Sequence, residues 1–135
     1  DGVGYARQAA LKFDLSGIGG TIAGATLALM PTSVGAANTF SNRVSLLASS
    51  AWTETGLTWN TVPGVSSVLG TWVVGAAGQP LTLDVTSGAV AAAGGDKVLP
   101  LKVDSPVNVG ANGWVNYGSR EATAANRPWL YVGYH

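Results

Sequence analysis

The sequence predicts an all-β protein, a sandwich of two antiparallel sheets with about eight or nine strands and one short helical turn. Three observations predict this fold class. Apolar and polar residues alternate along many short segments, turn-forming dipeptides separate these segments, and only one stretch has a helical composition. Neither an internal repeat nor a linker interrupts the pattern, so we expect a single domain over residues 1–135.

Six segments alternate clearly, and every second side chain of a strand points to the same face. The apolar residues expected in the core are Leu11, Phe13 and Leu15; Ala25, Leu27 and Leu29; Val44 and Leu46; Leu81, Leu83 and Val85; Leu99, Leu101 and Val103; and Leu130 and Val132. Val73 and Val115 mark two weaker strands.

Turn signals lie between these segments, because glycine adopts positive φ without steric cost. They are Gly19-Gly20, Pro63-Gly64, Gly94-Gly95 and Asn112-Gly113. The stretch TSGAVAAAGG predicts one or two helical turns, with Thr86 or Ser87 as the N-cap and Gly94 at the end.

The charge content is low and balanced. Charged residues make up 10% of the chain, and seven basic residues cancel seven acidic ones, so we expect no attraction to nucleic acid or to an anionic membrane. There is no cysteine, which excludes disulfides and thiolate chemistry. No apolar run approaches the roughly 20 residues that span a bilayer. This composition is typical of a secreted or surface-displayed β protein.

Catalytic residues are scarce. His135 is the only histidine and ends the chain, and Glu54 and Glu121 are the only glutamates, so neither a nucleophilic triad nor a His-ligated zinc is expected. Asp96, Asp104 and loop carbonyls could hold a structural calcium ion, but no dense acidic loop indicates one. We therefore expect no enzyme and no cofactor, and we assign no metal.

Several spaced motifs resemble a known family. They are Leu11-Lys12-Phe13-Asp14-Leu15; Trp52, Glu54, Leu57-Thr58-Trp59-Asn60 and Pro63; Asp84-Val85-Thr86 with Val90; Ser119-Arg120-Glu121; and Pro128, Leu130 and Tyr134. In this order they are similar to the DNRLRE domains, which overlap carbohydrate-binding module family 96. The resemblance implies a jelly-roll β-sandwich attached to extracellular polysaccharide-degrading enzymes or surface proteins, and some such domains bind alginate-like acidic polysaccharides.

The front of the chain departs from this family, which usually has one or two strands before the equivalent of ALKFDL. Here ten residues precede Leu11, and the chain begins at Asp1 without a signal peptide, so we expect that something was removed or that those strands come from elsewhere. One hypothesis is that a neighbouring subunit donates a strand into the groove beside Leu11 and so builds a polymer.

Two polar stretches each have two interpretations. In AWTETGLTWNTVPG, Trp52 and Trp59 are either lids over the open end of the sandwich or sugar-stacking platforms; the alternation of Leu57 and Trp59, typical of a short strand, favours lids. In SREA, Arg120 either pairs with Glu54 or Asp84 or holds a uronate carboxylate; the ion pair is favoured.

A binding surface follows from strand parity. If the core residues above point inward, Lys12, Lys102, Trp129 and Tyr131 point outward, and two ammonium groups beside two rings on one sheet face suit an acidic sugar chain. Parity does not fix a shared sheet, so scattered surface residues remain the alternative. Trp114 and Tyr117 near the Asn112-Gly113 turn form a second candidate, and Trp72 has no assigned place.

Two functions from different classes follow. The first is a non-catalytic extracellular module that binds polysaccharide, with acidic, alginate-like chains among the expected ligands. The alternative is a structural subunit of a cell-surface stalk or filament that self-associates. The low charge content and the short segment before Leu11 favour this alternative.

Overall fold

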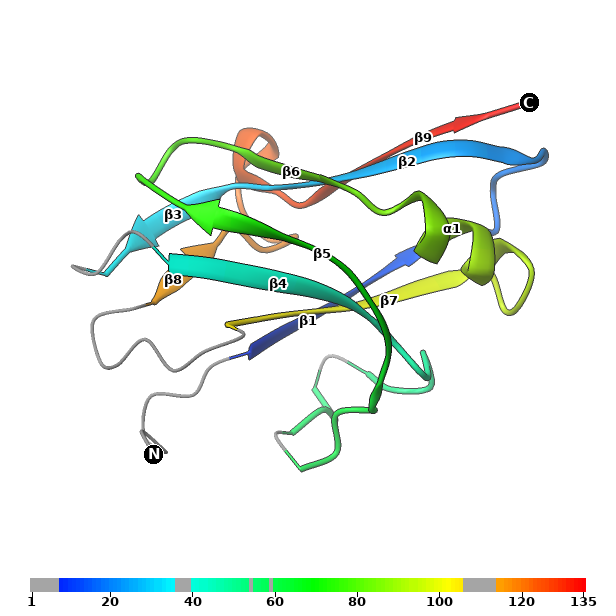
Figure 1. Ribbon diagram of the computed structural model, residues 1–135, viewed down its shortest axis with the longest axis horizontal. Coiled ribbons are helices and arrows are strands. Elements are labelled where there is room, and N and C mark those ends of the chain that lie inside the picture. Colours follow the sequence, from blue (N-terminus) through cyan, green and yellow to red (C-terminus); the bar gives the residue numbers. More distant parts are fainter. Residues whose placement is uncertain (1–7, 36–39, 54, 59, 106–113) are drawn as a thin grey trace.

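The computed structural model describes residues 8–35, 40–53, 55–58, 60–105 and 114–135. In these residues the chain forms nine strands, one α-helix and a short 3-10 turn (Figure 1). The elements are β1 (Gln8–Asp14), β2 (Ile22–Leu29), β3 (Pro31–Val34), β4 (Phe40–Leu47), β5 (Val65–Val74), β6 (Leu81–Asp84), α1 (Thr86–Ala93), β7 (Val98–Asp104), β8 (Val115–Tyr117), η2 (Ala124–Asn126) and β9 (Trp129–Tyr134).

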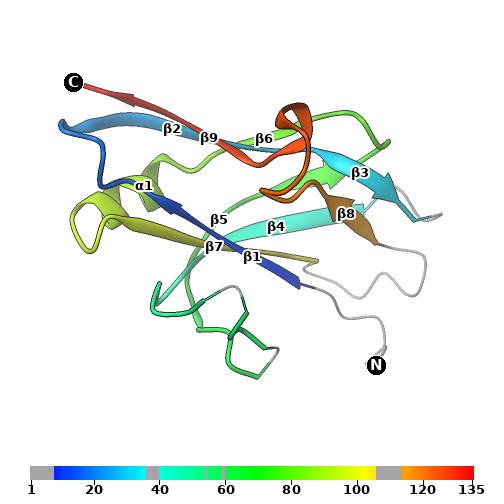
Figure 2. The same cartoon turned by 180° about the vertical axis from the view of Figure 1, so that it is seen from behind.

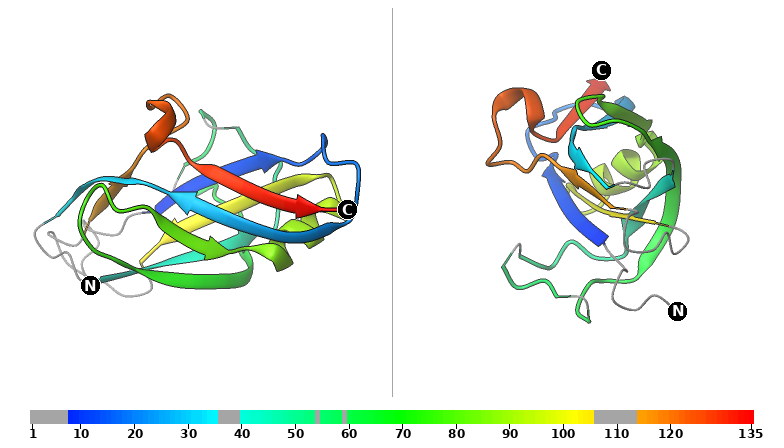
Figure 3. Two further views of the ribbon diagram at one scale, coloured as in Figure 1. Left: turned by 90° about the horizontal axis from the view of Figure 1, so that it is seen from above. Right: turned by 90° about the vertical axis from the view of Figure 1, so that its left-hand side faces the viewer.

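The strands form a two-layered antiparallel sandwich, which confirms the predicted fold class. One layer is a four-stranded sheet in the order β1-β7-β4-β5, and the other is a three-stranded sheet in the order β6-β2-β9. A two-stranded sheet, β3-β8, continues the second layer beyond the end of β2 (Figures 1 and 2). Every strand pair is antiparallel, and Figure 3 shows the layers from above and from one end.

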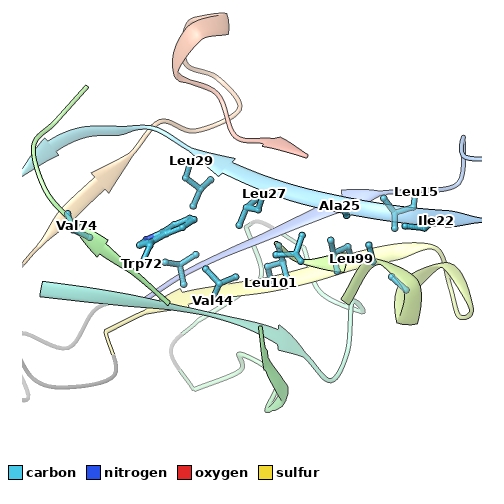
Figure 4. Close-up of a cluster of buried hydrophobic side chains, with 14 of the residues drawn as sticks. Leu15, Ile22, Ala25, Leu27, Leu29, Val44, Trp72, Val74, Leu99 and Leu101 are labelled. Atoms are coloured by element: carbon cyan, nitrogen blue, oxygen red, sulfur yellow. The ribbon is translucent and has the colours of Figure 1, made fainter. Parts of the chain in front are cut away.

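The core lies between the layers and includes the residues that the alternation predicts, together with residues that it did not predict, such as Phe40 and Val74. Leu27 of β2 and Leu99 and Leu101 of β7 are fully buried, and Figure 4 shows these side chains pointing toward one another from the two sheets. Trp72 of β5, which the sequence left unplaced, belongs to the same buried cluster. Burial of such apolar surface is the main free-energy gain of folding, at about 25 cal/mol per Å².

The outer side of β4 is covered as well. Val44 and Leu46 pack on the core cluster, but Ser45 and Leu47, which alternate with them, are also buried. The connection between β4 and β5 lies on this outer side of the four-stranded sheet (Figures 1 and 2). The sheet therefore buries part of both faces at β4.

Helix α1 closes one end of the sandwich. It ends at Gly94, as predicted, but Val85 occupies the N-cap position without a side-chain cap, so neither Thr86 nor Ser87 caps it. The Thr86 hydroxyl accepts instead from the backbone N–H of Ala25 at 3.0 Å. The helix is thereby tied to β2 by the residue expected to cap it.

Two predictions on local structure need correction. Leu57 and Thr58 lie outside any strand, so the predicted strand around Leu57 and Trp59 is wrong for the described residues, and Trp59 itself lies outside them. Strand β3 and the first half of β5 carry no clear alternation and were not predicted. The described residues contain no candidate membrane-spanning helix.

Candidate functional site

Two aromatic rings stand side by side on the outer face of β9. Trp129 and Tyr131 are 47% and 59% exposed, their ring centroids lie 6.2 Å apart, and their planes differ by 19°. They point outward because Leu130 and Val132, which alternate with them, pack against the core. The Trp129 indole N–H donates to the carbonyl of Ala124 in η2 at 3.2 Å. Alternation along β9 therefore places both rings on the outer face, and the hydrogen bond restricts the indole of Trp129.

The strands beside these rings carry small side chains on β2 and an acidic residue, Asp84, on β6. Across β2, Trp129 pairs with Ala28 and Tyr131 pairs with Thr26. Thr26 in turn pairs with Asp84 of β6. Asp84 Oδ1 accepts from the backbone N–H of Thr86 at 2.9 Å. Hydrogen bonds from the Thr86 side chain and backbone lower the pKa of Asp84, so this exposed carboxylate is charged at neutral pH.

The two lysines predicted beside the rings lie on the other layer. Lys12 is on β1 and Lys102 is on β7, both in the four-stranded sheet, whereas Trp129 and Tyr131 belong to the three-stranded sheet. The expected surface of two ammonium groups and two rings on one sheet face is therefore wrong. Parity correctly predicts outward side chains, but long-range pairing decides which layer a strand joins.

Lys12 is engaged by the β4–β5 connection. Its ammonium donates to the carbonyls of Ser50, at 3.2 Å, and Trp52, and it lies 4.7 Å from the centroid of the Trp52 ring. The Trp52 indole N–H donates to the carbonyl of Ser49 at 3.0 Å. Trp52 thus packs beside Lys12 of β1. Glu54, predicted as a partner of Arg120, lies outside the described residues.

Lys102 takes part in a cationic cluster with Arg43 and Asp104. Arg43 binds both carboxylate oxygens of Asp104, Nε to Oδ1 at 3.0 Å and Nη2 to Oδ2 at 2.8 Å, and Lys102 Nζ lies 3.5 Å from Oδ2. Hydrogen bonds to Asp104 raise the pKa of Arg43. Sequence reasoning missed Arg43, although its alternation with Val44 could have placed it outward.

The acids suggested for calcium do not meet. Asp96 precedes β7 and Asp104 ends it, so the strand separates them. Asp96 accepts from Ser50 and from the backbone N–H of Val98, which lowers its pKa. Across the described ranges, no three His, Cys, Asp or Glu residues gather as a metal site. Calcium therefore stays unassigned.

Tyr117 is half-buried on β8 and does not lie on a surface loop. Its hydroxyl accepts from the Trp72 indole N–H at 3.0 Å and donates to Asn42 Oδ1 at 2.7 Å. Burial raises the pKa of Tyr117 to about 12. Trp114 is half-buried and lines, with Tyr117 and residues 8–11 of β1, a cavity of about 680 Å³. The predicted pair is therefore brought together at a cavity beside β1, with Tyr117 held in a hydrogen-bond network.

Arg120 follows β8 and lies in a turn. Its Nε donates to Glu121 Oε1 at 2.9 Å, and both side chains are exposed. This pair lowers the pKa of Glu121. Of the two predicted partners of Arg120, Glu54 lies outside the described residues, and Asp84 accepts hydrogen bonds from Thr86.

The family comparison gives this geometry its context. The model of carbohydrate-binding module family 96 matches residues 1–134. The chain belongs to this family. The comparison with curated proteins found no match. Members of such families bind carbohydrate, are generally non-catalytic and are typically extracellular or on cell surfaces, so the family 96 match supports a polysaccharide partner.

Proposed function

We propose that this module holds a polysaccharide chain on the outer face of the three-stranded sheet, with Trp129 and Tyr131 stacked on its sugar rings. The observation that carries the proposal is the exposed, nearly parallel pair of rings on β9. The apolar C–H faces of a pyranose pack on indole and phenol rings, and an aromatic ring held in place loses little conformational entropy on binding. The hydrogen bond from Trp129 to Ala124 restricts the indole in this way.

The sequence predicts an acidic polysaccharide as the ligand class. We propose that an acidic chain contacts the four-stranded sheet, and not the sheet that carries the two rings. Arg43 and Lys102 surround the single carboxylate of Asp104, so this cluster carries one more positive charge than negative. Uronate carboxylates are bound by such cations. Binding of this kind weakens with salt, whereas stacking on Trp129 and Tyr131 does not.

Affinity electrophoresis in native gels that contain soluble neutral or acidic polysaccharides tests both contacts. Trp129→Ala and Tyr131→Ala are expected to abolish most of the retardation by a chain bound at the rings. Thr71→Ala is the control, because Thr71 is exposed on β5 of the other sheet. Lys102→Ala is expected to reduce the retardation by acidic chains only. Wild-type retardation of the double variant of Trp129 and Tyr131 in every gel would contradict the proposal for the rings.

Self-association into a surface stalk or filament is the second candidate function, and two observations favour it. Val65, Val68 and Val73 are 42%, 56% and 64% exposed along β5, which is an edge strand of the four-stranded sheet. Edge strands with exposed apolar residues are sites where another chain can pair. The cavity of about 680 Å³ lies beside β1, the other edge of this sheet, where a donated strand would fit.

Sedimentation velocity over a wide concentration range, with negative-stain microscopy, tests self-association. We expect larger species at high concentration and their loss in the double variant Val68→Lys and Val73→Lys. A single monomeric species at all concentrations, with no filament in the images, would rule out this function.

A further inference from the structure

A shallow groove of about 570 Å³ crosses the outer face of the three-stranded sheet beside the aromatic rings. Tyr131 on β9 lies at one side of the groove, and Asp84 at the end of β6 lies at the other. Thr26 on β2 lies between them, since it pairs with Tyr131 on one side and with Asp84 on the other. The groove therefore runs over three strands and begins at one of the two rings proposed to stack on sugar.

Two glycines open this groove. Gly24 of β2 and Gly133 of β9 are register partners in the row next to Thr26 and Tyr131. A Cβ atom built on Gly24 meets no atom within 4 Å, so the space above the backbone is open. A side chain at Gly24 would occupy the groove without displacing its walls, and φ at this position lies outside the range that excludes L residues.

The groove carries one charge, which is negative. Its lining, all within the described residues, includes the carboxylate of Asp84 and no lysine, arginine or histidine. Asp84 Oδ1 accepts from Thr86, and the pKa of Asp84 is lowered by these hydrogen bonds. Among the described residues, no hydrogen bond to Asp84 Oδ2 is present, so this oxygen can accept one from a ligand.

We infer that this groove binds a neutral sugar residue of the polysaccharide, with its ring against Tyr131 and one of its hydroxyl groups donating to Asp84 Oδ2. This inference rests on the proposed function and adds the substrate class. A hydroxyl–carboxylate hydrogen bond is stronger than one between neutral groups. A uronate or sulfate group in the same place faces the Asp84 carboxylate without a cation in the groove lining to offset the repulsion. The aromatic face therefore selects neutral chains.

Dissociation constants measured by calorimetry test this selection. The probes are soluble β-glucan, mannan and xylan as neutral chains, and alginate and polygalacturonate as acidic chains. Gly24→Val fills the groove, and Gly17→Val is its control, because a Cβ on Gly17 also meets no atom within 4 Å but lies outside the groove. Asp84→Asn keeps the shape and removes the charge. Thermal unfolding of each variant checks the fold.

The wild-type protein is expected to bind a neutral chain with little change in added salt. Gly24→Val should weaken this binding roughly tenfold, and Gly17→Val should leave it unchanged. Asp84→Asn should weaken neutral binding roughly fivefold and narrow the preference for neutral over acidic chains.

The outcomes separate this inference from the proposed function. If Trp129→Ala removes binding but both Gly24→Val and Asp84→Asn retain it, the groove inference is overturned and the proposed function stands. The inference also fails if acidic chains bind more tightly than neutral ones and lose their affinity in Trp129→Ala. If the wild-type protein binds none of the chains, the proposed function and the inference fail together.

Discussion

Trp72 on β5 donates its indole N–H to the hydroxyl of Tyr117 on β8 at 3.0 Å, and their ring centroids lie 6.0 Å apart. Tyr117 donates in turn to Asn42 of β4, which is 4% exposed. A chain of hydrogen bonds thus crosses the sandwich from the four-stranded sheet to the β3-β8 sheet. Each buried polar group in it has a partner, which is the condition for such a network to stabilise a core.

Alkaline pH should destabilise the fold through Tyr117. Burial raises the pKa of Tyr117 to about 12, against about 10 in an unfolded chain. The folded state therefore holds this proton more tightly, and its stabilising contribution is complete below about pH 10 and is lost as the pH rises toward 12. We expect the free energy of unfolding to fall by about 2–3 kcal/mol over this window.

Urea unfolding at a series of pH values measures this loss, with Tyr117→Phe as the comparison. The variant should be less stable at pH 8, because Trp72 and Asn42 lose their partner, but it should show a shallower decline above pH 10. Equal slopes for both proteins would refute the role of Tyr117.

Lys12 is expected to stabilise the β4–β5 connection and not to bind sugar. Lys12→Met keeps the apolar stem but removes the ammonium that contacts the Trp52 ring and the carbonyl of Ser50. We expect a loss of about 0.5–1 kcal/mol of unfolding free energy and faster proteolysis between β4 and β5. Lys12→Arg, which keeps the charge, should recover most of the protection. A loss of polysaccharide binding in Lys12→Met, with unchanged stability, would show that this assignment is wrong.

Ser45 should be replaceable with a gain in stability. Its hydroxyl is fully buried and has no hydrogen-bond partner in the described structure. An unsatisfied buried polar group costs about 1–3 kcal/mol, so Ser45→Ala is expected to raise the free energy of unfolding by about 1 kcal/mol. Ser66→Ala, at an exposed position on β5, serves as the control. Destabilisation by Ser45→Ala would indicate that the hydroxyl has a favourable contact.

Gly118 should tolerate no side chain. A Cβ atom there would lie 1.8 Å from the carbonyl oxygen of Asn126, and the backbone N–H of Gly118 donates to Met30 at 2.9 Å. Gly118→Ala must displace backbone on one side or the other, and we expect a loss of about 3 kcal/mol. Gly17→Ala, with open space around the new Cβ, should be neutral. Equal melting temperatures of the two variants would contradict this packing.

Local periodicity was sufficient to predict the strands that bury a single face. Leu27, Leu99 and Leu101 are fully buried because alternation along a strand needs no knowledge of its neighbours. The first half of β5 escaped prediction because its sequence, VSSVLG, has no such alternation. Trp72 escaped because its partner Tyr117 is 45 residues away in the chain.

The candidate site shows the same limit. Outward orientation of Trp129 and Lys102 follows from their own strands, but Trp129 pairs with Ala28 and Lys102 pairs with Ala10, and only these long-range partners assign them to different layers. Long-range strand pairing also places Asp84 and Gly24 in the groove. Family resemblance predicts a carbohydrate ligand, whereas strand register decides which residues lie together at the proposed site.

The separation of the rings from the Arg43–Lys102–Asp104 cluster has a direct consequence for titration experiments. The two groups belong to opposite layers of the sandwich, with the buried core between them. Molecules on the two sides would not compete for space. Saturating one side with a neutral chain should therefore leave the stoichiometry of acidic-chain uptake on the other side unchanged.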